Sequence, residues 1–168
     1  DLLWADVVLT STMVVQAPSL ADVVARCNRL DVPVAAGGPY PSVSPERLTG
    51  VDHIFIGEAE RAIDTFIEEL ERGRGKPAYR AEGLPDVDAS PVPRFDLLDI
   101  KAYASMAVQH SRGCPFSCEF CSVHAFDGQR IRSRSVEQVI SEIQEINSSP
   151  STYKKKKAIF FADDNIIA

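Results

Sequence analysis

The chain has 168 residues, 45% of them hydrophobic, and a formal net charge of −6. This composition is typical of an ordinary water-soluble globular protein, and the length allows one domain or two small ones. The acidic balance argues against a nucleic-acid partner. No apolar run approaches the roughly 20 residues that a membrane span needs.

The first residues of the chain carry neither an initiator Met nor the basic region and cleavage pattern of a signal peptide. They lead almost at once into a strand-like run, which predicts that the sequence is an internal part of a longer protein. Its cysteines follow no secretory pattern. Because free thiols persist in a reducing compartment, we expect a cytoplasmic location.

Residues 1–72 alternate short apolar runs with helical patterns. We expect strands at 5–10, 32–36 and 53–56, and helices that begin near Pro18 and near Ala59. Continuous apolar strands separated by helices are typical of a parallel sheet in an α/β protein. Within the first helix, Cys27 lies on the apolar stripe, so we interpret it as a small buried hydrophobe rather than a ligand.

Residues 73–101 change character, because prolines recur among Gly, Asp and Ser. This composition predicts an extended linker along a surface, with the apolar residues of 93–98 docking it. Residues 102–168 then read as one strand–helix–strand unit, with strands at 104–109 and 158–162. Ser135 and the side chain three residues later predict a capping box for the helix between them.

Cys114, Cys118 and Cys121 form a C-x3-C-x2-C triplet directly after the strand at 104–109. Three thiolates on one loop can hold three irons of a [4Fe–4S] cluster and leave the fourth iron open to a small molecule. His124 keeps a zinc site of three thiolates and one imidazole open as an alternative. A further alternative is three unrelated thiols. The loop lies at the carboxyl end of a strand. In α/β folds, the active-site residues usually lie at this end of the strands.

The triplet, with Phe120 just before its last cysteine, resembles the signature of the radical S-adenosylmethionine (SAM) family. Further segments extend the resemblance over nearly the whole chain, to B12-binding radical SAM proteins and most closely to the group that includes hopanoid C-2 methylases. These segments are residues 37–41, 51–58, 91–96, 111–116 and 161–165.

The resemblance implies an α/β fold in three parts. Residues 1–72 would be a partial Rossmann-like cobalamin-binding sheet, residues 73–101 a Pro-rich linker, and residues 102–168 the first βαβ unit of a radical SAM TIM-like barrel. It also implies the cofactors: a [4Fe–4S] cluster, S-adenosylmethionine and cobalamin.

The resemblance assigns residues to each cofactor. The cluster ligands would be Cys114, Cys118 and Cys121, and the SAM contacts would be Phe120, Asp164 and Asn165. The cobalamin contacts at strand ends would be Ser11, Thr12, Gly37, Gly38, Gly57 and Glu58. For the predicted cobalamin contacts, the alternative is that these residues only form turns and helix caps. The Asp-x-His-x-x-Gly motif of some B12 proteins is absent, and His53 is interpreted as structural because it begins a strand.

The implied activity is SAM cleavage followed by cobalamin-dependent methyl transfer to an unactivated carbon. Another radical SAM reaction, such as methylthiolation, and a metal-binding module without catalysis stay open as alternatives. The expected partners are a small-molecule or lipid-like substrate and an external electron donor, and exposed strand edges predict homodimerisation. His110 and Arg112 flank the cysteine loop and are candidates to orient SAM or a cluster sulfur, with a surface role as the alternative. Arg132 and Arg134 are expected in a solvated loop, with a contact to a carboxylate or phosphate as the alternative.

Overall fold

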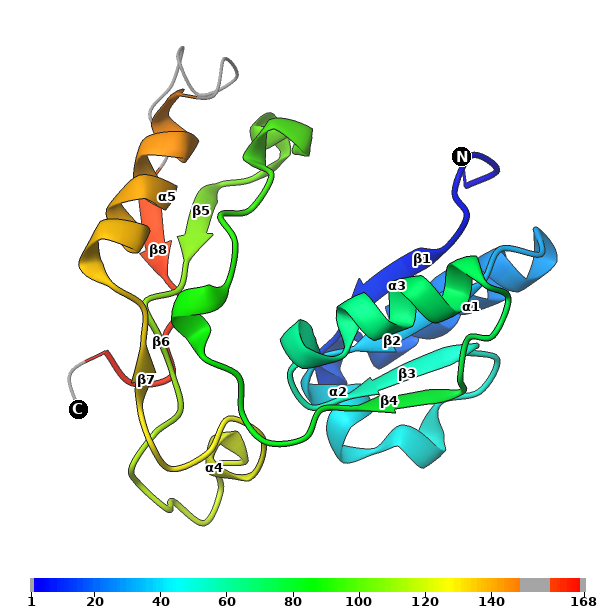
Figure 1. Ribbon diagram of the computed structural model, residues 1–168, viewed down its shortest axis with the longest axis horizontal. Helices are drawn as coiled ribbons and strands as arrows, with labels where there is room; N and C mark the ends of the chain where they lie inside the picture. Colours follow the sequence, from blue (N-terminus) through cyan, green and yellow to red (C-terminus); the bar gives the residue numbers. More distant parts are fainter. Residues whose placement is uncertain (1, 149–157, 167–168) are drawn as a thin grey trace. The chain divides into compact units, whose positions relative to one another are not determined.

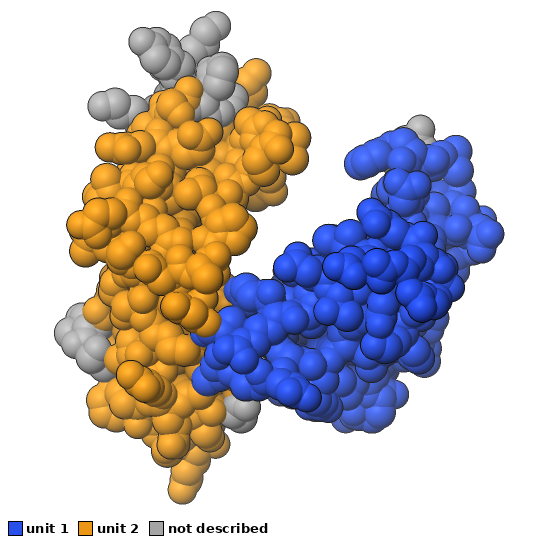
Figure 2. All heavy atoms as spheres, in the orientation of Figure 1, with its two compact units in different colours: residues 1–85 blue, residues 86–168 orange. Residues whose placement is uncertain are grey.

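The computed structural model describes residues 2–148 and 158–166. The chain divides into two compact units, Asp1–Pro85 and Asp86–Ala168, which Figure 2 shows in blue and orange. Each unit has its own hydrophobic core.

Unit 1 is built on a four-stranded parallel sheet, labelled in Figure 1. Its strands are β1 (Val8–Ser11), β2 (Val34–Gly37), β3 (His53–Ile56) and β4 (Ala78–Arg80), and they lie side by side in chain order. Parallel pairing joins each strand to the next. The expected α/β fold with a parallel sheet is therefore confirmed.

Two helices cover the two faces of this sheet. Side chains of β2 alternate between the faces, so Val34 and Ala36 join the core beneath α1 (Ala17–Arg29), whereas Ala35 joins the core beneath α3 (Ile63–Glu71). Burying a large side chain such as the Phe66 ring of α3 contributes roughly 1.5–3 kcal/mol. The remaining helical segments of unit 1 are α2 (Pro39–Val43) and the 3-10 turns Val14–Gln16, Pro45–Arg47 and Ala59–Arg61.

Residues 73–101, expected to be an extended linker, contribute to the cores of both units. Its first part forms β4, which pairs with β3 and brings Tyr79 into the core of unit 1. Its later part belongs to unit 2, where Phe95 of the predicted docking segment is buried but Leu97 is 72% exposed; Ile100, just beyond that segment, is buried as well. That later part contains the 3-10 turns Val87–Ala89, Phe95–Leu97 and Ile100–Ala102.

Unit 2 contains the expected strand–helix–strand arrangement. The strands β5 (Ser105–Val108) and β8 (Ala158–Phe161) pair in parallel, and α5 (Val136–Ser148) packs against β5. A short antiparallel ladder joins β6 (Ser111–Arg112) to β7 (Arg132–Ser133), with the single-turn helix α4 (Val123–Phe126) between them. The sequence patterns did not predict this ladder.

The apolar residues of helix α5 are only partly buried: Val139 and Ile146 join the core of unit 2, but others do not. Val136 and Ile140 are exposed at 66% and 47%, while Glu142 is 2% exposed. Its capping is also only half of the predicted box: Gln138 donates its backbone N–H to Ser135 Oγ, but its side-chain amide donates to the carbonyl of Ser90. Among the described residues, no helix is long and apolar enough to cross a membrane.

Candidate functional site

The predicted cobalamin contacts lie at one edge of unit 1. The strands β1, β2 and β3 are parallel, so their carboxyl ends meet at the same edge of the sheet. Ser11 and Gly37 are the last residues of β1 and β2, and Gly57 directly follows β3. The structure therefore gathers the expected residues along one edge: Ser11, Thr12, Gly37, Gly38, Gly57 and Glu58.

Two glycines shape this edge through their backbone. Gly38 has φ 94°, and a Cβ there would lie 2.8 Å from both Ser11 Oγ and the backbone nitrogen of Thr12. Only glycine therefore lets the end of β2 approach β1 so closely. Gly57 has φ 86°, and its Cβ position is open, with Ala81 Cβ the nearest atom at 3.9 Å. A ligand can thus approach the backbone at Gly57.

Ser42 forms hydrogen bonds to both glycines, a role that the sequence did not predict. Its hydroxyl donates to the carbonyl of Gly38 at 2.8 Å and accepts the N–H of Gly57 at 3.0 Å. The residue follows Pro41 in a segment that looked like a plain turn, so no signal in the sequence marked it. The loops after β2 and β3 are consequently held as one surface.

Thr12 supplies an unused polar group at the same edge. The residue is 8% exposed, and within the described part of the chain its hydroxyl oxygen has no hydrogen-bond partner. Buried polar groups usually have a hydrogen-bond partner. The Thr12 hydroxyl is therefore available to a ligand at the carboxyl edge of the sheet.

His53 takes the structural role expected for it. It begins β3, at the amino edge of the sheet and thus away from the predicted contacts. Its Nδ1 donates to the carbonyl of Lys76 at 2.7 Å, and its ring packs edge-on against Phe66 and Tyr79. It is therefore not placed to act as a cobalt ligand at the carboxyl edge.

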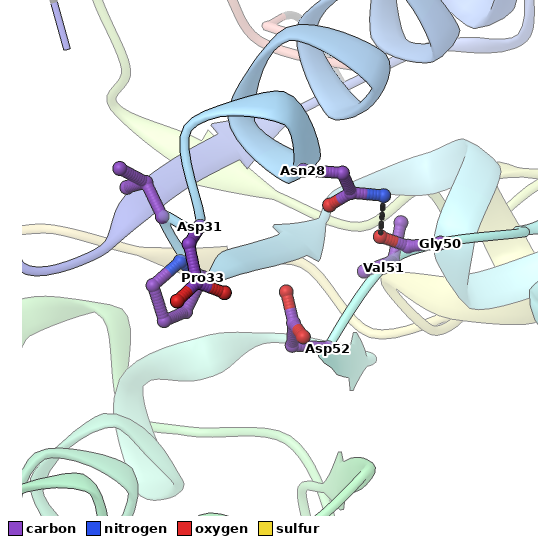
Figure 3. A pocket seen from close by; sticks show the side chains of 7 residues that line it. Asn28, Asp31, Pro33, Gly50, Val51 and Asp52 are labelled. Atoms are coloured by element: carbon purple, nitrogen blue, oxygen red, sulfur yellow. Dashed lines mark hydrogen bonds between the residues drawn. The ribbon is translucent and has the colours of Figure 1, made fainter.

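A pocket of about 340 Å³ also opens at this amino edge (Figure 3). Asn28 donates to the carbonyl of Gly50 across it, and Asp52 accepts the N–H of Val34. None of its lining residues is among the predicted site residues, and its acidic side chains are exposed.

In unit 2, the cysteine loop begins on a position that requires glycine. Gly113 has φ 92°, and a Cβ there would lie 2.6 Å from the carbonyl oxygen of Arg130. The next residue, Cys114, donates its backbone N–H to the carbonyl of Gly128 at 3.2 Å. The first cysteine is thus fixed against the returning chain by its backbone.

All three loop cysteines are free thiols; Cys118 is exposed, and Cys114 and Cys121 are partly buried. Within residues 2–148 and 158–166, no group of three or more His, Cys, Asp or Glu side chains could hold one metal ion. A closed zinc site needs four ligands that converge on one point, so the alternative with His124 stays a prediction, as the cluster does. In a [4Fe–4S] cluster, by contrast, each thiolate binds a different iron, and three free thiols on one loop are suitable donors.

The end of β8 meets the cysteine loop through two carboxylates. Asp163 Oδ1 accepts the backbone N–H groups of His110 at 2.7 Å and Ser111 at 3.0 Å. Asp164 Oδ2 accepts the N–H of Gly113 at 3.1 Å. The expected proximity of this segment to the loop is therefore present, although Asp163 was not among the predicted site residues.

The predicted SAM contacts differ in how they lie relative to the cysteine loop. The amide nitrogen of Asn165 lies 3.8 Å from Cys114 Sγ, within range of a weak hydrogen bond to sulfur. Phe120 is 93% exposed, so its ring covers no core. One oxygen of Asp164 is engaged with Gly113, which partly commits that side chain to the loop.

The expectation of a solvated loop is wrong for Arg134. The residue is 8% exposed, and its guanidinium donates both to Glu142 and to the carbonyl of Gln109. This buried ion pair accounts for the unexpected burial of Glu142 in α5. Near the loop, Arg112 donates to the side chain of Gln109 at 2.8 Å, and His110 is 35% exposed at its side chain.

Comparison with known proteins agrees with this architecture. Residues 1–67 match the model of the B12 binding domain. The chain is 36% identical to an uncharacterized methyltransferase of Synechocystis sp., covering 98% of this chain and 30% of the relative. It is 31% identical to the hopanoid C-2 methylase of Rhodopseudomonas palustris, covering 99% of this chain and 32% of the relative.

A solved structure shares the fold over the same extent. The cobalamin-dependent S-adenosylmethionine radical enzyme OxsB, with aqua-cobalamin and S-adenosylmethionine bound, superimposes with a TM-score of 0.73 at 21% identity. The match covers 99% of this chain and 27% of that one. The chain thus spans about a third of the length of the curated relatives reported above.

Unit 1 is therefore an α/β domain of the B12-binding type, with its glycine-rich edge at the carboxyl ends of the strands. The similarity to the two relatives continues beyond unit 1, through the cysteine loop to the end of unit 2.

Proposed function

We propose that this chain provides the cobalamin-binding and cluster-binding parts of a radical SAM methyltransferase acting on an unactivated carbon. One observation carries the proposal: a B12-binding sequence and three free thiols on a strand-end loop occur in the same chain. The named relatives support it, since both are methyltransferases or methylases.

Each residue of the loop has a defined task in this proposal. Cys114, Cys118 and Cys121 would be the cluster ligands, with Gly113 allowing the turn that presents the first of them. A bound [4Fe–4S] cluster would supply the electron that cleaves the sulfonium of S-adenosylmethionine, and cobalamin would supply methyl transfer. The exposed ring of Phe120 is available to stack on an adenine.

At the edge of unit 1, the corrin would rest on backbone rather than on large side chains. Gly57 leaves room for a planar ligand, and the orphan hydroxyl of Thr12 offers it a hydrogen bond. Ser42 would act indirectly, by keeping the two glycine loops in register. Ser11, Gly37, Gly38 and Glu58 complete the proposed contact surface.

The proposed reaction needs an electron donor, a reducing environment and a substrate. The electron has to come from an external donor, and free thiols of this kind require a reducing compartment such as the cytoplasm. The substrate would be a small or lipid-like molecule. Homodimerisation through exposed strand edges stays a prediction, to be checked by light scattering.

Anaerobic reconstitution tests the cluster. The chain should take up about four irons and show the absorbance and spin-resonance signals of a [4Fe–4S] cluster. Cys114→Ala, Cys118→Ala and Cys121→Ala should each lose most of this iron. Cys27→Ala is the matched control, because that cysteine is fully buried in the core of unit 1. A single bound zinc, or fewer than about three irons in oxygen-free protein, would overturn the proposal.

Titration with aqua-cobalamin, followed by absorbance, tests the proposed cobalamin binding by unit 1. Gly57→Val fills the open backbone position and should weaken binding strongly, while Thr12→Val should weaken it by the loss of one hydrogen bond, about 1 kcal/mol. Gly73→Val is the control, because Gly73 also has a positive φ of 64° and nothing lies within 4 Å of its Cβ position. Equal affinity in all variants would place the ligand elsewhere.

A further inference from the structure

The backbone that leads to the cysteine loop leaves β8 at the end of β5 and pairs with β7 only at Ser111 and Arg112. The ladder between β5 and β8 ends with Val108 opposite Phe161, and its last hydrogen bond runs from the N–H of Ala162 to the carbonyl of Val108. The backbone that follows β5 must carry Cys114 to its position without further bonds from a strand of β8. Its N–H groups therefore need other acceptors.

Asp163 provides the first of these acceptors. Its side chain is 1% exposed, and one oxygen accepts the N–H groups of both His110 and Ser111. Its other oxygen accepts no hydrogen bond within the described residues and lies 3.7 Å from Nδ1 of His110. Hydrogen bonds to an ionised acceptor are the strong ones, and a buried carboxylate is costly without them. The carboxylate and this backbone are thus held in one arrangement.

Asp164 extends the same attachment by one step. Its oxygen accepts the N–H of Gly113, the residue directly before Cys114. Consecutive carboxylates at the end of β8 therefore bind three backbone N–H groups between the end of β5 and the first cysteine. Of the two, Asp163 is the buried one and makes two of the three bonds.

From these contacts we infer that Asp163 is a positioning residue for the cluster: it holds the backbone at 110–111 and thereby fixes where Cys114 lies. It acts through the loop and not by touching SAM or the substrate. This inference rests on the proposed function and goes beyond it, because it gives the β8 terminus a task in assembling the metal centre.

Two variants and one control test the inference. Asp163→Ala removes the acceptor, whereas Asp163→Asn keeps an oxygen in the same place without the charge. Asp52→Ala is the matched control, because Asp52 also binds a backbone N–H with its carboxylate, that of Val34 at 2.8 Å, but in unit 1. Amide hydrogen exchange on the metal-free chain and retention of the reconstituted cluster against a chelator are the two measurements.

We expect amide exchange at residues 110 and 111 to accelerate in D163A, and cluster retention to fall by about 10-fold or more, the usual cost of losing a supporting contact around a metal site. D163N should lie between D163A and the unsubstituted chain. D52A should speed exchange at Val34 and leave cluster retention unchanged. If D163A does not fold, the intermediate retention expected of D163N decides the matter.

Failure of the inference differs from failure of the proposed function. If the unsubstituted chain assembles the cluster and D163A and D163N hold it equally well, the inference alone is wrong. Unchanged exchange at residues 110 and 111 in D163A also overturns it. If the unsubstituted chain assembles no cluster, the proposed function is wrong, and the inference falls with it.

Discussion

The edge of unit 1 is shaped by backbone and small side chains, whereas the cysteine loop of unit 2 is held by charged side chains. In unit 1, Ser42 joins Gly38 to Gly57 over separations of 4 and 15 residues. In unit 2, Asp163 reaches His110 across 53 residues. A surface for a flat ligand needs close backbone approach, while an irregular loop needs side chains that substitute for strand pairing.

The two units also differ in whether their ion pairs are buried. The buried ion pair between Arg134 and Glu142 lies in unit 2, beside the strand that leads into the loop. In unit 1, Lys76 forms an ion pair with Glu69, but its side chain is largely exposed. The two units should therefore respond differently to the loss of a charge. Of the four predictions below, the first and the last test this, and the other two test close backbone contacts and a buried hydroxyl.

The largest effect is expected from Arg134→Met. The substitution leaves the carboxylate of Glu142 buried without its partner, which costs about 3–5 kcal/mol of unfolding free energy. Denaturant unfolding, combined with hydrogen exchange in α5, measures the loss in unit 2.

Two further variants sharpen this prediction. The double substitution R134M/E142L should restore most of the stability, since replacing both partners of a buried pair is often nearly neutral. Arg94→Met is the control, because Arg94 pairs with Asp96 at the surface and should matter little. A double variant as unstable as the single one would contradict the account.

The next effect compares one glycine from each unit. Gly113→Ala should cost about 3 kcal/mol and Gly38→Ala about 2–3 kcal/mol, because each adds a Cβ against backbone atoms at a positive φ. Hydrogen exchange should report the first in unit 2 and the second in unit 1. Gly73→Ala, which meets no neighbour within 4 Å, should cost about 1 kcal/mol. Equal costs at all three positions would show that the close contacts do not matter.

A smaller effect is expected from Tyr79→Phe in unit 1. The Tyr79 hydroxyl donates to Glu69 and accepts the backbone N–H of Lys76, both at 2.8 Å. Its loss should cost about 1 kcal/mol, since a net hydrogen bond contributes about that much. Thermal unfolding measures the change, and an unaltered midpoint would mean that water replaces the hydroxyl at no cost.

The smallest effect is a pH dependence in unit 1. Hydrogen bonds from Lys76 and then Tyr79 lower the pKa of Glu69 below its ordinary value of 4.5. Because the folded-state pKa is depressed, the stabilisation is present above about pH 4.5 and is lost as the pH falls through the lower folded value. Unfolding at pH 6 and pH 3 should therefore differ less for Glu69→Gln than for the unsubstituted chain. An equal difference in both proteins would remove Glu69 as a cause.

Local patterns in the sequence predicted much of the fold. The strand expected at 53–56 is β3 residue for residue, and the apolar stripe around Cys27 is the buried face of α1. Periodicity succeeded there because burial on one face of a helix or in a central strand leaves a regular pattern. The short run of β4 lay among glycines and prolines and left no such pattern.

The candidate sites were predicted as residue types but not as contacts. The cysteine triplet and the glycines stand out by spacing, whereas Ser42 and Asp163 act through partners that the sequence does not place beside them. Glu142 was missed for a related reason: a carboxylate on a helix suggests solvent unless its buried partner, here Arg134, is known. Long-range hydrogen bonds and ion pairs are what local patterns omit.

The distance along the chain between His110 and Asp163 sets an order of events during synthesis. A ribosome that adds about 5–20 residues per second needs roughly 3–10 s to make the 53 residues between them. During that interval the newly made thiols lack the carboxylates that shape their loop. Under the proposed function, metal delivery to the nascent polypeptide would therefore follow, rather than precede, the emergence of β8.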